Sequence, residues 1–169
     1  MTAAGLTLVR RWRAADERQR LLQIVQPALI GLIDGTISTL APIFATAYIA
    51  GSKAALLVGL AAALGAAISM GMSEGLSDDG EITGRGAALQ RGFITGLATF
   101  VGGTAHALPF LISDIDTALT IAYVVVAIEL VAIAWVRKRF LNVALRTSLI
   151  QVTLGGIIVA AVGVIVGHA

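Results

Sequence analysis

Five side chains that can bind metal ions or protons lie within or beside the apolar stretches of this chain: Asp34, Met70, Glu74, His106 and Glu129. An ionisable side chain at the centre of a membrane helix costs about 2.5–3.5 kcal/mol on insertion scales. Because of this cost, such residues usually serve a function, most often the binding of a cation or the transfer of a proton.

Asp34 lies eight residues into an apolar stretch, roughly 12 Å along a helix at 1.5 Å per residue, which is close to mid-membrane. Two readings are open. The carboxylate could bind a divalent cation, or it could form a hydrogen bond with a neighbouring helix at a close crossing permitted by Gly31 and Gly35. We favour the first reading because a neutral Asn would satisfy such a hydrogen bond at a lower cost.

Met70 and Glu74 are four residues apart and therefore share one face of a helix. A thioether beside a carboxylate suits a borderline divalent ion such as Fe²⁺, because the sulfur discriminates against hard Mg²⁺. Asp34 and this pair lie in the same half of their helices. Antiparallel packing could therefore bring them to similar depths and assemble one metal site.

His106 and Glu129 are candidates for proton coupling. His106 lies between a diglycine and Pro109, and it could accept a proton or serve as a hydrogen-bonded packing residue. Glu129, in the middle of a later apolar stretch, could couple to protons or remain neutral through burial. Gln151 is expected to form a hydrogen bond between helices.

The composition indicates the kind of fold that positions these residues. Of the 169 residues, 57% are hydrophobic and 13% are charged, whereas soluble domains have about 45–50% and about 25%. We expect an all-α polytopic membrane protein, since a membrane helix needs about 20 mostly apolar residues. Five stretches qualify, at residues 26–50, 54–75, 92–112, 117–136 and 143–167.

The basic residues predict the topology. Eleven of the 12 Lys and Arg residues fall before the first span, between the second and third, or between the fourth and fifth, and Lys53 is the exception. The cytoplasmic side carries such an excess, so we expect the N-terminus inside and the C-terminus outside. The chain then divides into a basic amphipathic segment, 1–25, and a five-helix transmembrane domain, 26–169. The first segment either lies along the membrane or is a solvated stub. Anionic lipid explains its charge without nucleic acid.

Several activities are excluded. The chain has no cysteine, and with His168 next to the last residue a three-histidine zinc site cannot be built around His106. No Gly-x-Ser-x-Gly motif is present. We therefore expect neither an enzyme nor a bound cofactor. The remaining alternatives are a metal transporter and a non-transporting scaffold or partner subunit, whose glycine pairs at 31/35, 71/75, 92/96 and 163/167 would only pack helices.

Three segments, in order, resemble motifs of the vacuolar iron transporter family. They are DGTISTL at 34–40, SMGMSE at 69–74, and FVGG at 100–103 followed by LPF at 108–110. The resemblance implies a homodimeric exporter that moves Fe²⁺ and/or Mn²⁺ out of the cytoplasm in exchange for protons. It also implies that Asp34 and Met70 lie on the metal path and that Glu74 is the carboxylate on the cytoplasmic side. If the source is bacterial, the membrane would be the plasma membrane.

The chain also departs from that family. Ser73 replaces a glycine, Gly75 stands where the family has an aromatic residue, and His106 replaces a proline or an apolar residue. The metal-capturing helical insert of eukaryotic members is missing. In its place is the short linker 77–91, whose acids Asp78, Asp79 and Glu81 are expected in a solvated loop. In the expected dimer the first spans meet at the two-fold axis, so a cysteine at Thr39 should cross-link the two copies.

Overall fold

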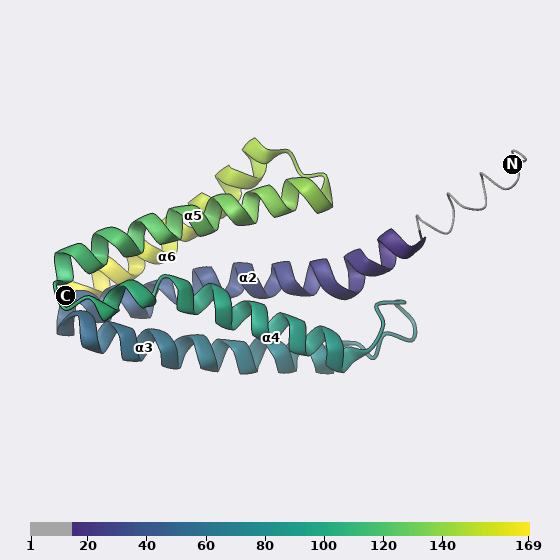
Figure 1. Cartoon of the computed structure of the whole chain (residues 1–169), viewed down its shortest axis with the longest axis horizontal. Coiled ribbons are helices and arrows are strands. Elements are labelled where there is room, and N and C mark those ends of the chain that lie inside the picture. The colour runs from purple at the N-terminus through teal and green to yellow at the C-terminus, as the bar shows by residue number, and fades with distance from the viewer. Residues whose placement is uncertain (1–14) are drawn as a thin grey trace, which may run out of the picture.

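The computed structural model describes residues 15–169, and this part of the chain is helical with short turns and no strand (Figure 1). A helical turn from Ala15 and the π-helix η1 (Leu21–Val25) lead directly into α2 (Gln26–Ser38). Next come α3 (Leu40–Ser77), α4 (Ala88–Ala105), the 3₁₀-helix η2 (Leu108–Leu111), α5 (Ile115–Leu141) and α6 (Leu145–Gly167). The all-α fold expected from the sequence is confirmed.

The chain reverses direction inside α3. The helical run Ala15–Ser77 has 63 residues, and a straight helix of that length would measure roughly 95 Å, about three times the hydrocarbon core of a bilayer. Gly51 interrupts the run with φ 77° and ψ −175°, a conformation that glycine adopts without a Cβ clash. Residues after Gly51 run back antiparallel to α2 and pack chiefly against α4, so α3 consists of two antiparallel parts (Figure 1).

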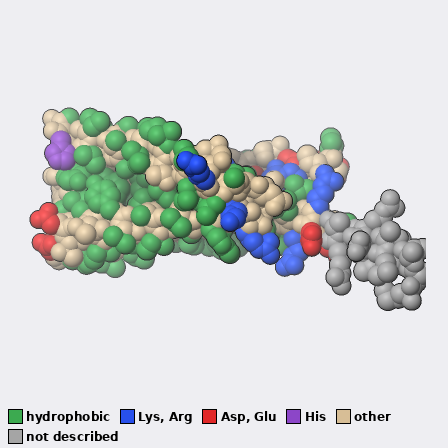
Figure 2. Space-filling model, turned by 90° about the horizontal axis from the view of Figure 1, so that it is seen from above, with side chains coloured by type: hydrophobic (Ala, Val, Ile, Leu, Met, Phe, Trp, Pro, Cys, Tyr) green, Lys and Arg blue, Asp and Glu red, His purple; other side chains and the backbone are tan. Residues whose placement is uncertain are grey.

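Three helical runs of the described chain are long and apolar enough to cross a membrane: Ala15–Ser77, Ile115–Leu141 and Leu145–Gly167. Their outward faces carry large apolar side chains, among them Leu64, Ile128 and Ile157. Figure 2 shows apolar side chains along the length of the molecule and Lys and Arg gathered toward one end. This distribution suits a bundle whose sides contact lipid.

Glycines bring the helices together. A Cβ on Gly31 would lie 2.1 Å from the Thr95 carbonyl oxygen, and one on Gly35 would lie 2.0 Å from that of Thr99. The backbones of α2 and α4 are therefore in direct contact, which requires glycine. The glycine pairs 71/75 and 92/96 face each other across α3 and α4, and 163/167 face Ala41 and Ala45. All four pairs therefore lie at helix contacts, as the scaffold alternative required of them.

Several predicted boundaries were wrong. The stretch 92–112 is not one helix, because α4 begins at Ala88 and ends at Ala105. Pro109 has no N–H with which to continue the helix, and the chain turns into η2. The stretch 26–50 is interrupted at Thr39, where α2 ends. Residues 15–25 of the basic segment are helical and continue into α2, and residues 1–14 lie outside the described part, so the expected surface helix is not tested.

Candidate metal and proton sites

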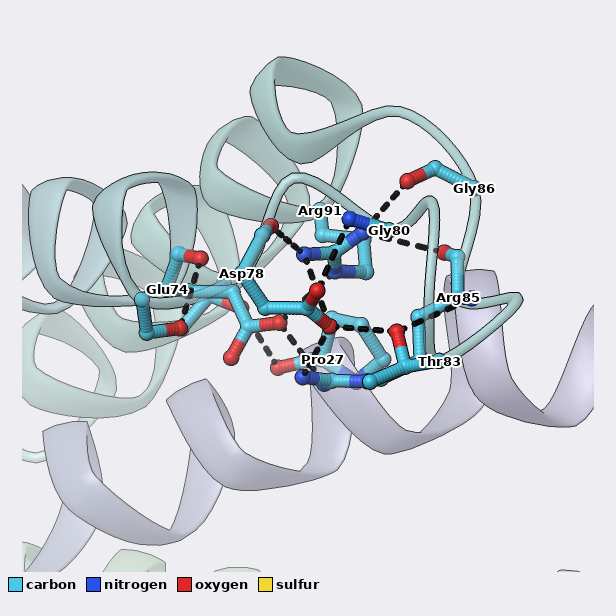
Figure 3. A network of polar contacts seen from close by, with 10 residues as sticks. Pro27, Glu74, Asp78, Gly80, Thr83, Arg85, Gly86 and Arg91 are labelled. Carbon is cyan, nitrogen blue, oxygen red and sulfur yellow. Dashed lines mark hydrogen bonds and ion pairs between the residues drawn. The ribbon is translucent and has the colours of Figure 1, made fainter.

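Glu74 lies where the last turns of α3 meet the first turn of α4. Its Oε1 accepts hydrogen bonds from Arg85 Nη2 at 2.7 Å and from Arg91 Nε at 2.9 Å (Figure 3). The two guanidinium groups compensate the charge of this carboxylate. A cation that binds Glu74 must therefore compete with them.

Arg91 is completely buried, and each nitrogen of its guanidinium has a partner. Nη1 donates to the carbonyls of Gly86 at 2.5 Å and Arg85 at 3.2 Å, and Nη2 donates to the carbonyl of Asp78 (Figure 3). A buried charge is tolerated when it is paired and hydrogen-bonded in this way. Arg91 therefore fixes the 78–86 loop onto the end of the bundle.

Asp78 belongs to the same network. The expectation that it would be a solvated loop residue was therefore wrong. Its Oδ2 accepts from the Thr83 hydroxyl at 2.6 Å and its Oδ1 from the Gly80 N–H at 2.8 Å. Arg85 and Arg91 lie 3.7 Å from Oδ2. The bonds from Thr83 and Gly80, with help from the two arginines, lower the pKa of Asp78 below its usual range. Asp79 and Glu81 are exposed, as predicted.

Asp34 is half-buried, and no side chain among residues 15–169 forms a hydrogen bond or an ion pair with it. Residues at i and i+4 lie along one side of a helix, so Asp34 shares a stripe with Ile30 and Ser38, both exposed. The close crossing at Gly31 and Gly35 exists as foreseen, but Asp34 has no partner across it in this chain.

The structure does not bring Asp34 and Glu74 together within one chain. Contacts of Gly31 and Gly35 place Asp34 opposite the second half of α4, and contacts of Gly71 and Gly75 place Glu74 opposite its first turn. The two carboxylates are about nine residues apart along α4, roughly 14 Å at 1.5 Å per residue. No group of three or more His, Cys, Asp or Glu side chains in the described part of the chain could hold a metal ion. Met70 lies between the positions of Asp34 and Glu74 along the bundle, and its side chain is half-buried.

His106 and Glu129 are in contact. Nδ1 of His106 lies 2.8 Å from Oε2 of Glu129, and Nε2 lies 2.8 Å from the Thr39 hydroxyl oxygen. Thr39 occupies the break between α2 and α3, and its hydroxyl donates to the Gly35 carbonyl at 2.8 Å. The chain of contacts thus joins α5, the end of α4 and the residue next to Asp34.

This group lies deep in the bundle. Thr39 is twelve residues from the reversal at Gly51, roughly 18 Å at 1.5 Å per residue. The hydrocarbon core of a bilayer is about 30 Å thick, so a residue at that distance from the reversal lies well inside it. A charge at this depth needs compensation, and the buried imidazole lies against a carboxylate that is 11% exposed.

Two residues of these hydrogen-bond networks were not singled out as site residues in the sequence. Arg91 was counted only as a charge that sets topology, because its burial and its contact with Glu74 depend on how the 78–86 loop folds. Thr39 was noted only as part of the DGTISTL segment and as a position for a cross-link, because its contact depends on where His106 lies.

A family model described as VIT family matches residues 75–168, more than half of the chain. The matched range includes the arginines of the loop network and the pair His106 and Glu129. It begins one residue after Glu74, so Asp34 and Met70 lie outside it. No curated protein and no solved structure matches the chain.

Proposed function

Because the chain belongs to the VIT family, as its motifs suggested, we propose that it exports Fe²⁺ and/or Mn²⁺ from the cytoplasm in exchange for protons. Membership of this family indicates metal transport across a membrane and not an enzyme. The long apolar helices agree with an integral membrane protein. The identity of the metal, the direction of transport and the coupling to protons are parts of the proposal.

The observation that carries the proposal is the carboxylate of Asp34. It has no hydrogen-bonding or ionic partner in the described chain, and it lies in the apolar helix α2, about one turn before the break at Thr39. A divalent cation that has lost part of its hydration shell would supply the missing partner. The alternative, a non-transporting scaffold, explains the glycine contacts but gives no use for this acid.

The test is metal flux into proteoliposomes, comparing Fe²⁺, Mn²⁺, Co²⁺ and Zn²⁺ with and without a pH gradient. Asp34→Asn keeps the shape of the side chain and removes its charge, so we expect flux to be lost while the helix content is unchanged. Asp79→Asn, in the exposed part of the loop, is the matched control and should transport normally. Full flux in Asp34→Asn would overturn the proposal.

We also propose five membrane spans with the N-terminus inside and the C-terminus outside. The parts of α2 and α3 before Gly51, the part of α3 after it, α4, α5 and α6 are five antiparallel rods within residues 15–169. The end that carries most Lys and Arg would then face the cytoplasm (Figure 2). Asp79 and Asp116 lie at opposite ends of the bundle. Accessibility labelling of a single cysteine at each position would test this topology, because Asp79 should be reached from the cytoplasm and Asp116 from outside.

The proposed homodimer would place a second copy against the stripe of Ile30, Asp34 and Ser38. Two carboxylates and two Met70 thioethers could then line one path. The sequence suggested Thr39 as the position for a cross-linking cysteine, but Thr39 is 1% exposed and bonded to His106, so we propose Ser38 in its place. Ser38→Cys should cross-link and Thr39→Cys should not. An uncross-linked but active Ser38→Cys protein that transports as a monomer would contradict a shared path.

Arg85 gives the end cluster a role in the same function. Its side chain is 21% exposed at the rim of the network, whereas that of Arg91 is fully buried. A divalent cation that reaches Glu74 could therefore displace Arg85 and leave Arg91 in place. In this proposal Glu74 is the first carboxylate on the path and Arg85 occupies it when no metal is bound.

A further inference from the structure

The hydrogen bonds around His106 limit where its protons can be. The Thr39 hydroxyl has one proton, and the Gly35 carbonyl 2.8 Å away can only accept it. While the hydroxyl donates to this carbonyl, the Thr39 oxygen accepts from His106, which places a proton on Nε2. The second acceptor within reach of the same hydroxyl is Nε2 itself, so the contacts allow one alternative, in which Nε2 has no proton.

A second proton is needed on the other side of the ring. Nδ1 of His106 and Oε2 of Glu129 are 2.8 Å apart, and a hydrogen bond between them requires a proton on one of the two atoms. If it is on Nδ1, the pair is an imidazolium with a carboxylate. If it is on Oε2, the pair is a neutral imidazole with a carboxylic acid. Both arrangements hold the same number of protons and have no net charge.

We infer that His106 and Glu129 share one exchangeable proton in mid-bundle, and that its loss turns the Thr39 hydroxyl from the Gly35 carbonyl to the His106 ring. When this proton leaves for water, the pair has one ring proton and a charge of −1. The ring proton then sits on Nδ1, where it can donate to the Glu129 carboxylate. Nε2 becomes an acceptor, and the nearest donor for it is the Thr39 hydroxyl.

The position of Thr39 gives this exchange a structural effect. The N–H of Thr39 bonds to the Ile37 carbonyl instead of continuing the α-helical pattern. The bond from its hydroxyl to the Gly35 carbonyl therefore ties the residue at the break to the last turn of α2. Loss of the shared proton would release the carbonyl next to Asp34. A coupling between this change and metal release would rest on the proposed metal–proton exchange. The inference that His106 and Glu129 share a proton does not depend on that proposal.

Other charged groups do not replace Glu129 in this role. Among residues 15–169, Glu129 is the one titratable or charged side chain within hydrogen-bond distance of the imidazole. The others on the helices packed around it are Asp34 on α2, Tyr48, Lys53 and Glu74 on α3, Arg91 on α4, and Asp116, Tyr123, Arg137, Lys138 and Arg139 on α5.

Nitrogen NMR tests the inference directly. The chain has two histidines, so full-length protein with ¹⁵N-labelled histidine rings, in lipid nanodiscs, gives two sets of signals, and His168→Gln assigns those of His106. Over a titration from about pH 5 to about pH 9, we expect Nε2 to be protonated at the lower end and Nδ1 to carry the single ring proton at the upper end. A proton that stays on Nε2 throughout would overturn the inference.

Substitutions separate this switch from ordinary packing. Glu129→Gln should abolish the pH-dependent change of tautomer, and a wild-type titration in this variant would also overturn the inference. Thr39→Val should shift or abolish the change, whereas Thr39→Ser should retain it. Thr46→Val is the matched control, because Thr46 makes the same bond to the carbonyl four residues earlier, at 2.7 Å, without a histidine.

Flux measurements distinguish this inference from the proposed function. Glu129→Gln should still bind and move metal but should lose the acceleration by a pH gradient. If the wild-type chain moves neither Fe²⁺ nor Mn²⁺, the proposed function fails and the NMR result stands. If metal flux depends on the pH gradient while the tautomer of His106 stays constant, the inference of a shared proton is wrong and the proposed function stands.

Discussion

Removing Arg91 should destabilise the protein much more than removing Arg85, although both bind the same oxygen of Glu74. Arg91→Ala removes the ion pair and the donors to the carbonyls of Asp78, Arg85 and Gly86. Breaking a buried pair by removing one partner costs about 3–5 kcal/mol. Glu74 keeps Arg85 and water can reach the loop, so we expect a loss of about 3 kcal/mol, at the lower end of that range.

Arg85→Ala removes a partly exposed guanidinium with one short contact to Glu74. Solvent-exposed ion pairs contribute about 0–1 kcal/mol. The expected difference between the two variants is therefore at least about 2 kcal/mol. Arg91→Lys should resemble Arg91→Ala more than the wild type, because one ammonium group cannot reach Glu74 and three carbonyls together.

The measurement is reversible unfolding in mixed detergent micelles, followed by helical circular dichroism. Hydrogen exchange in the 78–86 loop should rise strongly in Arg91→Ala and little in Arg85→Ala. Equal destabilisation by the two alanine variants would refute the assignment of Arg91 as the residue that holds this end together. Arg85→Ala should also bind Mn²⁺ more tightly, because one competing cation has been removed from Glu74.

Three further predictions concern other parts of the chain. Gly35→Ala should destabilise by about 1–3 kcal/mol, because its Cβ would lie 2.0 Å from a backbone oxygen of α4; Gly65→Ala, with no atom within 4 Å, should be neutral or gain up to about 1 kcal/mol. Met70→Leu should lower the ratio of Fe²⁺ to Mn²⁺ flux with little effect on stability, and an unchanged ratio would remove its sulfur from the path. Because the pKa of Asp78 is lowered, its stabilisation of the loop should be complete above its usual value of 3.8 and lost as the pH falls below it. The protection of the Gly80 amide against hydrogen exchange, relative to an unfolded peptide, should then fall only in acid. Asp78→Asn should remove that pH dependence.

The sequence predicted those features that depend on short-range pattern. Apolar stretches gave the helices, glycine pairs gave the crossings, and Gln151 was expected to bridge two helices, as its bond with Arg137 at 2.9 Å confirms. The contact between His106 and Glu129 could not be predicted, because it depends on how η2 directs the chain from α4 to α5. The break at Thr39 was also missed, since the surrounding residues fit one continuous apolar helix. Whether Asp34 belongs to a shared site depends on the position of a second copy of the chain, and the sequence of a single chain does not give that position.

The glycine contacts described above also restrict which parts can move. Backbone meets backbone where α4 crosses α2 and the second half of α3, so these helices cannot slide past one another without first separating. They should move as a single rigid body. Between that body and the hairpin of α5 and α6 lies a cavity of about 530 Å³, lined by Ile33, Ile37 and Gln151 among others. In the described chain, two side-chain hydrogen bonds link the hairpin to the rest, from Tyr123 to Tyr48 and from Glu129 to His106. Gly163 and Gly167 of α6 also contact the backbone of Ala41 and Ala45, so a hinge between the two bodies must pivot at this end. Opening about that pivot would widen the cavity beside Ile33 and Ile37 and would also change the contact that holds the shared proton.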